Sequence, residues 1–374
     1  MTDAAPDREA VVDLGAVRRN VETLRATIGT EHTIAVVKAN AYGHGAVPVA
    51  RAALAGGADR LGVADVSEAL ELREADIAAP LLAWLHGARP DFTRTVEANV
   101  ELGISTLDQL DAAIDAAKST GRVAVVHLKL DTGLSRNGLS ADAWPTATRA
   151  ARAAETAGLV RVAGVFSHLS GTSPDADTAQ ADALDRGLAD AARAGLDPEF
   201  VHLAASGAAL TLPGTRYNTV RLGISIYGLS PFSDREPAEF GLTPAMTLRS
   251  RVVATRSIPD GQGVSYGHTY RASGDTNLAL VPVGYADGLP RQASGAAEVW
   301  IGGARRPVAG RVAMDQIVVD VDGTPASVGD EVVLFGDPAT GVPSAEDWAR
   351  AAGTIGYDIV TRLGSRVRRT YVGE

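Results

Sequence analysis

Residues 33–45 read TIAVVKANAYGHG, and this stretch sets the structural pattern for the first half of the chain. Its first half is almost continuously apolar, as is typical of a strand covered on both faces of a parallel sheet. Lys38 follows directly, and a turn with Gly43 and Gly45 leads into an apolar helical pattern. The stretch therefore predicts one βα unit with a polar residue at the carboxyl end of its strand.

The same unit recurs seven more times before residue 223. The expected strands are 33–37, 61–64, 81–84, 102–105, 123–130, 162–167, 200–203 and 220–222. The helical patterns between them include 45–55, 67–75, 107–118, 141–157 and 178–194, with Ser67 as the expected N-cap of the second. Eight βα units are the number that closes a (β/α)₈ TIM barrel. A doubly wound open sheet is the structural alternative, but the G-x-G-x-x-G fingerprint after its first strand is absent.

The pattern changes from about residue 237. Short strands are expected at 246–258, 277–283, 298–301, 316–321 and 331–335, between turns rich in Gly and Asp, with a short helix at 344–352. The fold class is therefore α/β, with an N-terminal TIM barrel and a C-terminal mostly-β domain. We expect three parts: residues 1–13 as a strand that packs with the C-terminal domain, 14–236 as the barrel, and 237–374 as the β domain.

Composition argues against several functional classes. Lys and Arg number 35 against 45 for Asp and Glu, a net charge of −10, whereas a general nucleic-acid binder has a basic surplus. Cysteine is absent, so disulfides, Cys-ligated metals and thiol nucleophiles are excluded. The acidic residues 1–7 do not resemble a secretory signal, and no apolar run approaches the ~20 residues of a membrane span. We expect a cytoplasmic protein without nucleic-acid or membrane partners.

Polar side chains occur at the expected carboxyl ends of the barrel strands, where barrels place their active sites. They include a lysine, two arginines and two histidines: Lys38, Arg136, Arg221, His168 and His202. A half-buried lysine has a lowered pKa and can condense with a carbonyl. The loops at 205–208 and 221–225 suit a phosphate. Together these features indicate pyridoxal phosphate, although a surface lysine, an ordinary helix cap or a rim salt bridge would explain each feature alone.

Residues 36–45 resemble the pyridoxal-phosphate signature of the alanine racemase family. Six further blocks resemble the same family in order: 131–138, 220–224, 264–267, 283–288, 310–316 and 354–357. The resemblance implies a pyridoxal 5'-phosphate enzyme that interconverts L-alanine and D-alanine, supplying D-alanine for peptidoglycan. It also implies a homodimer in which the C-terminal domain of each subunit completes the active site of its partner.

The two proton-transfer groups follow from this resemblance. Lys38 matches the lysine that binds the cofactor covalently and serves as the base for D-alanine. Tyr266, contributed by the partner subunit, matches the base for L-alanine. Racemisation removes a proton from one face of Cα and returns it on the other, so two groups must flank the cofactor. His168 and Arg221 match neighbours of that tyrosine that would favour its phenolate form.

The resemblance assigns the remaining site residues as well. Arg221 matches the residue that faces the pyridine nitrogen, and His202 its support. Arg136 matches the contact to the cofactor's phenolic oxygen and to the substrate carboxylate. Lys129 is either carbamylated and paired with Arg136, or a plain solvent-facing lysine. The phosphate cradle matches Tyr42, Ser206, Gly223, Ile224 and Tyr357; the partner's substrate pocket matches Met314 and Asp315; and the substrate access corridor matches Tyr285 and Arg291.

The chain departs from the family pattern at three positions. Ala205 replaces the usual Asn, Leu222 the usual Pro, and Ala313 a frequent Cys, and none of these is a proton-transfer group.

Other functions are weighed against this resemblance. A broader racemase, for example for serine, or an amino-acid decarboxylase on the same scaffold remain alternatives. The absence of Cys argues against the decarboxylase, whose motif contains Cys. Broad-spectrum racemases tend to be exported, and no export signal is visible in this sequence. A non-catalytic pyridoxal-phosphate carrier would resemble the barrel alone. We expect no metal site, because no H-E-x-x-H motif is present, although His168 and His202 on adjacent strands keep a weak metal alternative open.

Overall fold

The computed structural model describes residues 7–87 and 90–373. Two compact units make up the chain. One unit comprises residues 21–41 and 49–226, and the other comprises residues 42–48, 227–374 and the N-terminal residues up to Asn20. The part of the expected N-terminal segment that falls on residues 1–6 lies outside the described residues.

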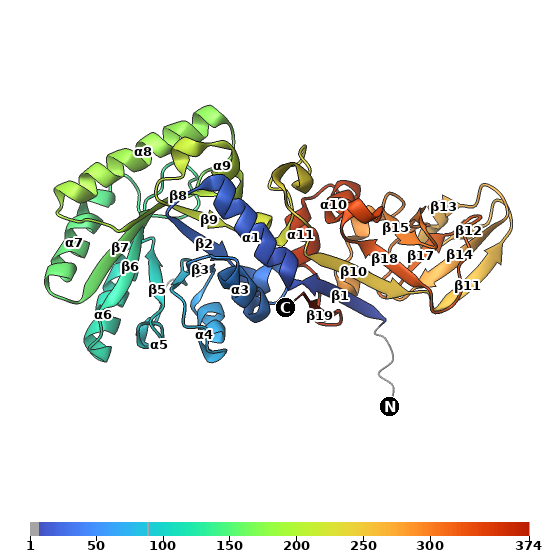
Figure 1. Ribbon diagram of the computed structural model, residues 1–374, viewed down its shortest axis with the longest axis horizontal. Helices are drawn as coiled ribbons and strands as arrows, with labels where there is room; N and C mark the ends of the chain where they lie inside the picture. Colours follow the sequence, from blue (N-terminus) through green and yellow to red (C-terminus); the bar gives the residue numbers. More distant parts are fainter. Residues whose placement is uncertain (1–6, 88–89, 374) are drawn as a thin grey trace. The chain divides into compact units, whose positions relative to one another are not determined.

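The first unit contains a closed barrel of parallel strands in chain order, and the predicted fold class is confirmed (Figure 1). Each predicted barrel strand is present within two residues of its expected bounds. The strands are β2 (His32–Val36), β3 (Arg60–Val63), β4 (Leu81–Ala83), β5 (Glu101–Ile104), β6 (Ala124–Lys129), β7 (Val160–Phe166), β8 (Phe200–Ala205) and β9 (Thr219–Leu222). Pairing of β9 with β2 closes the barrel.

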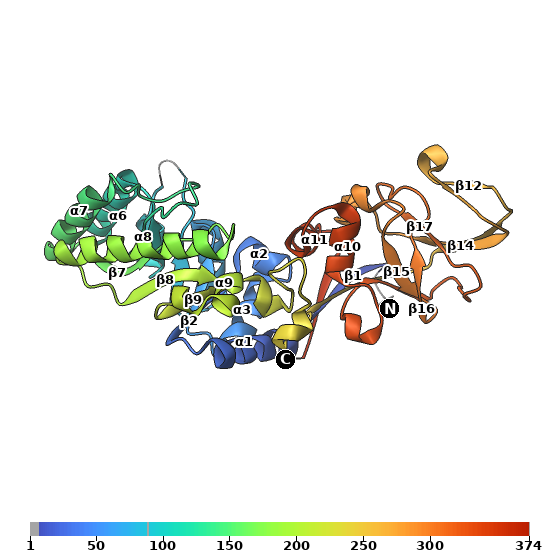
Figure 2. The same cartoon turned by 90° about the horizontal axis from the view of Figure 1, so that it is seen from above.

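Helices cover the outside of the barrel. They include α3 (Ala46–Ala55), α4 (Val66–Glu74), α5 (Thr93–Glu97), α6 (Leu107–Thr120), α7 (Trp144–Thr156) and α8 (Pro174–Arg193). The last three follow one another around the barrel (Figures 1 and 2). The buried Trp144 joins α7 to α8, because its Nε1 donates to the carbonyl of Gly187 at 2.9 Å.

Two helix starts differ from the expectation. The N-cap of α4 is Asp65 and not Ser67, because the Asp65 carboxylate accepts the amide proton of Glu68 at 3.0 Å while Ser67 donates its hydroxyl to Asp65. Helix α8 begins four residues early because Ser173 caps it, accepting from the amide of Ala176 at 3.2 Å, and Pro174 suits its first turn.

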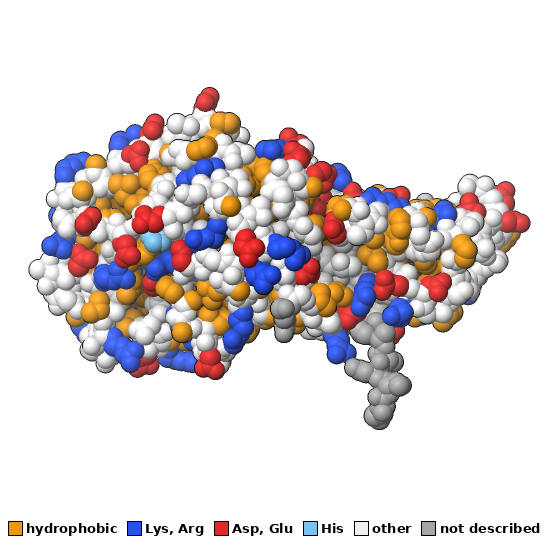
Figure 3. Space-filling view, in the orientation of Figure 1, with side chains coloured by type: hydrophobic (Ala, Val, Ile, Leu, Met, Phe, Trp, Pro, Cys, Tyr) orange, Lys and Arg blue, Asp and Glu red, His pale blue; other side chains and the backbone are white. Residues whose placement is uncertain are grey.

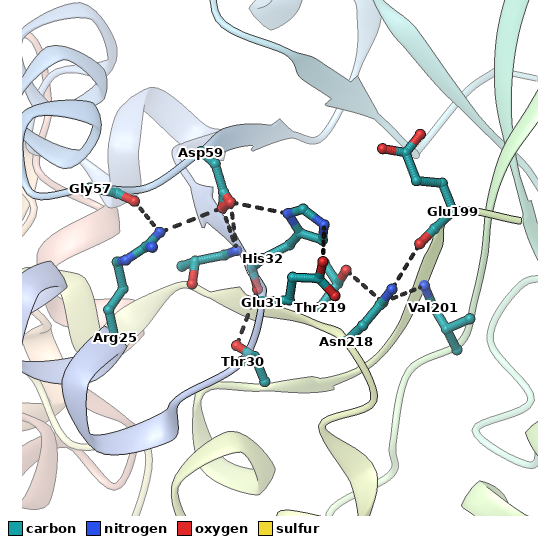
Figure 4. Close-up of polar contacts among 11 residues, drawn as sticks. Arg25, Thr30, Glu31, His32, Gly57, Asp59, Glu199, Val201, Asn218 and Thr219 are labelled. Carbon is teal, nitrogen blue, oxygen red and sulfur yellow. Dashed lines mark hydrogen bonds and ion pairs between the residues drawn. The ribbon is translucent and has the colours of Figure 1, made fainter.

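Polar contacts fix the amino-terminal rim of the barrel (Figure 4). The Asp59 carboxylate accepts from the backbone amide of Thr33 at 2.6 Å and lies 3.4 Å from Nδ1 of His32 and 3.6 Å from Nη1 of Arg25. Asn218 donates to the carbonyl of Glu199 at 2.8 Å and accepts from the amide of Val201 at 2.9 Å. These bonds hold the starts of β2, β8 and β9, at the end of the barrel that serves stability rather than catalysis.

The second unit consists mostly of strands. A six-stranded sheet has the order β16-β15-β18-β10-β1-β19, a three-stranded sheet the order β11-β14-β17, and β12 pairs with β13. Their bounds are β1 (Arg8–Asp13), β10 (Met246–Arg251), β11 (Ala254–Ile258), β12 (Gly263–Val264), β13 (Tyr270–Arg271), β14 (Thr276–Val281), β15 (Glu298–Ile301), β16 (Ala304–Pro307), β17 (Ile317–Asp320), β18 (Glu331–Phe335) and β19 (Arg368–Val372). Strand β1 pairs with β10 antiparallel and with β19 parallel.

The single strand expected at 246–258 is wrong: the segment forms β10 and β11, which belong to different sheets. The chain changes sheets between two valines. The amide of Val252 donates to the carbonyl of Asp330, next to β18, whereas the amide of Val253 donates to that of Leu280 in β14. Both residues are apolar, so the hydropathy pattern runs through the break.

Two short helices complete the second unit. Helix α10 (Ala345–Ala352) begins with a capping box between Ser344 and Asp347, and α11 (Gly356–Thr361) follows it. No helix among the described residues is long and apolar enough to cross a membrane. Acidic and basic side chains are intermixed over the face drawn in Figure 3, which shows no extended basic surface.

Candidate active site

The predicted cations gather at the carboxyl ends of the barrel strands. Lys38 begins the short helix α2 (Lys38–Tyr42) just after β2, Lys129 ends β6, and Arg221 lies near the end of β9. Burial lowers the pKa of Lys38, and the positive charges of Arg136 and Arg221 lower it further against the opposing effect of Glu68. The structure therefore brings a half-buried amine and two guanidinium groups to one rim.

The backbone behind Lys38 is left-handed. Ala39, Asn40, Ala41 and Tyr42 have φ between 51° and 53°, a region that costs non-glycine residues about 1–2 kcal/mol each. Glu68 compensates, because its carboxylate accepts the amides of Ala39 at 2.6 Å and Ala64 at 2.7 Å. Glu68 thus ties the turn after Lys38 to the next βα unit, and strain of this kind is typical of functional sites.

Arg221 is held by five hydrogen bonds. Nη1 donates to Nδ1 and to the carbonyl of His202, at 3.0 and 2.9 Å. Nη2 donates to the carbonyls of Ser167 and Leu203 and to Nδ1 of His168, at 2.9, 2.8 and 3.1 Å. Burial and the nearby Arg136 lower the pKa of Arg221 to about 10, so it stays protonated at neutral pH.

The two histidines are neutral acceptors toward Arg221. Burial and the charge of Arg221 lower the pKa of His168 to about 3, and the same causes lower that of His202 well below its usual range. A guanidinium can only donate, so each Nδ1 accepts and each remaining proton sits on Nε2. The metal alternative therefore loses both Nδ1 nitrogens, and the described residues contain no group of three His, Cys, Asp or Glu side chains placed to hold a metal ion.

Lys129 is buried rather than solvent-facing, which corrects one of the two expectations for it. Its residue is 4% exposed, and Nζ donates to Oδ1 of Asn137. Burial, Arg221 and Arg136 lower its pKa to about 8. The neutral fraction of this amine near neutral pH is therefore larger than that of an ordinary lysine.

The expected phosphate residues form two groups, one in each unit. In the barrel unit the buried Ser206 begins α9 (Ser206–Thr211), its Oγ accepts from the amide of Gly223 at 3.0 Å, and a 3₁₀ turn begins at Ile224. Ala205, where the family has Asn, precedes α9 without a side-chain cap.

The second group is a pair of buried phenols. The rings of Tyr42 and Tyr357 lie 6.1 Å apart. Burial raises the pKa of Tyr42, and it raises that of Tyr357 to about 12. Both phenols therefore remain protonated and can donate to an anion.

Tyr285, Met314 and Asp315 lie together in the second unit. The amide of Tyr285 donates to the carbonyl of Ala313 at 3.0 Å, and the amide of Ala286 donates to that of Met314 at 2.9 Å. Arg366 holds Asp315 at 2.7 Å and also reaches the buried Asp287 at 3.0 Å. Met314 and Tyr285 are both exposed in the single chain, and the predicted Arg291 begins a separate 3₁₀ turn.

Tyr266 lies at the tip of a strained turn. It follows Ser265, which has a φ of 60°, and it is 70% exposed. The hydroxyl of Ser265 donates to the carbonyl of Arg311 at 2.8 Å, which ties this turn to the segment that leads to Met314. Most of the Tyr266 side chain is therefore open to solvent in the single chain.

Comparisons with known proteins agree along the whole chain. The family model "Alanine racemase, N-terminal domain" matches residues 12–231, and "Alanine racemase, C-terminal domain" matches residues 245–371. A protein named alanine racemase from Salinispora arenicola is 48% identical over 370 residues, covering 98% of each chain. One similar solved structure is the crystal structure of alanine racemase from D-cycloserine producing Streptomyces lavendulae. It has a TM-score of 0.97 and 47% sequence identity, and the match covers 100% of this chain and 98% of that chain. The structure of alanine racemase from Streptomyces coelicolor also has a TM-score of 0.97, with 45% sequence identity, and the match covers 100% of both chains.

The chain belongs to the alanine racemase family. Alanine racemases are isomerases, so the protein is an enzyme of that class. The family resemblance inferred from the seven sequence blocks is therefore confirmed.

Sequence reasoning missed several polar residues that support the candidate site. Glu68 clamps the turn after Lys38, and Arg366 holds Asp315. His127 and Glu101 lie in the barrel interior, where they continue the contacts of His202. A signal for His127 was present, because it interrupts the apolar run of β6 and a glycine, Gly164, faces it from β7. Glu68 and Arg366 lie in ordinary helical or loop contexts and gave no such signal.

Proposed function

We propose that the protein is an alanine racemase that interconverts L-alanine and D-alanine with pyridoxal 5'-phosphate by a two-base mechanism. We further propose that it works in the cytoplasm as a homodimer and supplies D-alanine for peptidoglycan. The observation that carries the proposal is the amine of Lys38, with its lowered pKa, beside an Arg221 guanidinium that five hydrogen bonds hold in place.

The donor set fits this cofactor. The group is an anionic phosphate ester with an aldehyde, and the rim offers a reactive amine together with two guanidinium groups, Arg136 and Arg221. Ser206, Gly223 and Ile224 would hold the phosphate in the barrel unit. The family resemblance assigns Tyr42 and Tyr357 to the phosphate as well. When bound, pyridoxal phosphate supplies a carbonyl for covalent attachment of the amino acid and a ring that delocalises charge from Cα.

Lys38 and Tyr266 would act as the two bases. The lowered pKa of Lys38 increases its neutral fraction near neutral pH, which is the form that accepts a proton. The partner subunit's Tyr266 would act on the opposite face. His168, protonated on Nε2 because Arg221 occupies Nδ1, is a hydrogen-bond donor that would favour phenolate on that tyrosine. This support acts by hydrogen bonding, since His168 is neutral.

Arg221 and its support would direct where the proton returns. At a pKa of about 10, Arg221 keeps its protons rather than giving one to the cofactor ring. Arg221 would therefore leave the nitrogen of a bound ring unprotonated, and its hydrogen bonds with His202 and His168 would hold it in that place. Arg221, His202 and His168 would thus favour racemisation over transamination.

Arg136 would bind the substrate carboxylate, with Met314 and Asp315 of the partner completing a small pocket and Tyr285 and Arg291 forming the access corridor. We propose that Lys129 is carbamylated, because its neutral fraction can react with carbon dioxide and the product is an anion able to hold Arg136. A small pocket favours the methyl group of alanine but rejects serine only modestly.

The test is incubation of the purified enzyme with L-alanine in deuterated water. Loss of optical activity together with deuterium at Cα supports the racemase. Release of carbon dioxide would indicate the decarboxylase instead, and equal rates for serine would indicate a broader racemase. Lys38→Ala is the matched control and should show turnover in neither direction.

A further inference from the structure

A column of polar side chains crosses the barrel interior, which branched apolar residues usually fill. Glu101 begins β5, His127 lies within β6, His202 lies within β8, and Arg221 lies near the end of β9. Each of these residues is less than a tenth exposed. The column therefore links the amino-terminal end of the barrel to the candidate active site at the other end.

Hydrogen bonds connect these side chains in series. Nη1 of Arg221 lies 3.0 Å from Nδ1 of His202, and Nε2 of His202 lies 3.0 Å from Nδ1 of His127. Nε2 of His127 lies 2.9 Å from Oε2 of Glu101. The other carboxylate oxygen of Glu101 accepts from Nη2 of Arg60.

The direction of every bond in this series can be deduced from its first member, Arg221. Arg221 can only donate, so Nδ1 of His202 accepts and its proton lies on Nε2. That proton is donated to Nδ1 of His127, which leaves the His127 proton on Nε2, facing Glu101. His127 therefore cannot be an imidazolium although a carboxylate lies beside it, because both of its nitrogens would then be donors. Burial lowers the pKa of His127, which also favours the neutral ring.

The fold makes room for this series at specific points. The register of β6 and β7 shifts between Val126 and His127, so the pairing of the two strands is irregular where the His127 ring enters the barrel. A Cβ on Gly164 would lie 2.1 Å from Nδ1 of His127, so only glycine leaves space for the ring there. The His202 ring stacks on Phe166 with centroids 4.7 Å apart, and the His127 ring stacks on Phe200 at 5.9 Å.

Glu101 is the only obligate acceptor in the series. Burial opposes its ionisation, but the hydrogen bond from His127 and the charge and hydrogen bond of Arg60 hold its pKa below its usual range. As a carboxylate, Glu101 has no proton to donate, just as Arg221 has no lone pair to offer. The two ends of the series are thus of opposite and fixed polarity.

We propose that Glu101 is a positioning residue that sets the tautomers of His127 and His202 and thereby orients Arg221 toward the cofactor. The catalytic part of this inference rests on the proposed function. The tautomer assignment does not, because it follows from the contacts alone.

Glu101→Gln tests the proposal, because it replaces one acceptor oxygen by an NH₂ donor. The charged Arg60 can only donate and makes the stronger bond, so the amide oxygen faces Arg60 and the NH₂ group faces His127. His127 must then accept at Nε2 and carry its proton on Nδ1. His202 in turn carries its proton on Nδ1, where it opposes the N–H of Arg221, and the bond to Arg221 is lost.

Arg60→Met supplies the matched control. With Glu101 intact, Arg60→Met leaves the acceptor for His127 in place, so both tautomers should stay as in the wild type. In the double variant Glu101→Gln/Arg60→Met, the amide oxygen is free to turn toward His127. The double variant should therefore regain the wild-type tautomers, which a merely structural role of Glu101 would not produce.

The measurement is ¹⁵N NMR of histidine-labelled purified enzyme, since protonated and unprotonated ring nitrogens have well separated shifts. Each of the 7 histidines is assigned by its own substitution. We expect His127 and His202 to carry their protons on Nε2 in the wild type, on Nδ1 in Glu101→Gln, and again on Nε2 in the double variant. A wild-type His202 protonated on Nδ1, or tautomers that ignore Glu101→Gln, would overturn the proposal, and the wild-type spectrum decides even if a variant fails to fold.

Kinetics provide the second readout. Losing a charge-assisted bond of Arg221 should lower kcat in Glu101→Gln about tenfold to hundredfold with KM nearly unchanged, and the double variant should recover most of this loss. A kcat that is unchanged in Glu101→Gln, or equally low in the double variant, would overturn the positioning role. If the wild-type enzyme failed to racemise alanine, the proposed function would fall while the NMR comparison still judged the tautomers.

Discussion

We expect Gly164→Ala to perturb the candidate active site, although position 164 is not part of that site. The added Cβ would lie 2.1 Å from Nδ1 of His127 and 2.7 Å from its Cε1. Carbon contacts are favourable only from about 3.5 Å, so the ring must retreat by about 1.4 Å. Its bond to His202 is already 3.0 Å long, and a displacement of that size along the bond would break it.

The cost has two sources. An unpaired buried ring nitrogen costs about 1–3 kcal/mol, and overpacking a close-packed interior costs about another 1–3 kcal/mol. We therefore expect Gly164→Ala to lower the free energy of unfolding by about 2–6 kcal/mol and to lower kcat, because His202 then supports Arg221 less firmly.

Equilibrium urea unfolding at matched protein concentration measures the stability change, with kcat taken below the transition. Gly214→Ala is the control, since a Cβ there meets nothing within 4 Å. In the background of His127→Ala the clash is gone, so adding Gly164→Ala should cost no more than about 0.5 kcal/mol. A Gly164→Ala protein as stable as the wild type, or an equal cost in both backgrounds, would refute the placement of the His127 ring.

Mixing Lys38→Ala and Tyr266→Phe subunits should restore about a quarter of the wild-type activity. Random pairing makes half of the dimers hybrid, and each hybrid contains one intact site of two. If no activity returned, both bases would come from the same subunit. Lys129 has a pKa of about 8, so about a tenth of its amine should be neutral at pH 7 and about nine tenths at pH 9. ¹³C NMR with labelled bicarbonate should therefore show more carbamate as the pH rises over this range. A carbamate signal that persists in Lys129→Arg would come from another amine. Asp59→Ala should lower the free energy of unfolding by about 1–2 kcal/mol, because it removes the hydrogen bond to the amide of Thr33. The kcat should not change, because the Asp59 contacts lie at the opposite end of the barrel from Lys38. A reduced kcat would count against this separation.

The barrel was predictable because its strands are short and nearly uninterrupted in apolar residues. The same cue failed at Val252 and Val253, which continue the apolar pattern while their amides bond to different sheets. It also could not show that the four residues after Lys38 are left-handed, since Ala, Asn, Ala and Tyr do not require that conformation. Glu68, which stabilises it, lies 29 positions from its partner Ala39.

The rim residues of the candidate site were predictable as residue types at strand ends, but their chemical states were not. Lys129 ends a strand, yet only the structure shows that it is buried and bonded to Asn137. His168 could have been an imidazolium by its residue type. It is neutral because three-dimensional packing places Arg221 against its Nδ1. Protonation states depend on partners from other strands, and strand spacing alone does not supply those partners.

The exposure of Tyr266 has a consequence for the proposed mechanism. A phenol accepts a proton only as phenolate, and a hydrogen-bond donor beside the oxygen favours that form. In the single chain this side chain is 70% exposed, and the turn that carries it is fixed by the bond from Ser265 to Arg311. Association with a second subunit would bring this phenol to the hydrogen-bond donor on His168. The second base of the reaction would then exist only in the dimer, and racemisation in both directions would depend on subunit association rather than on either chain alone.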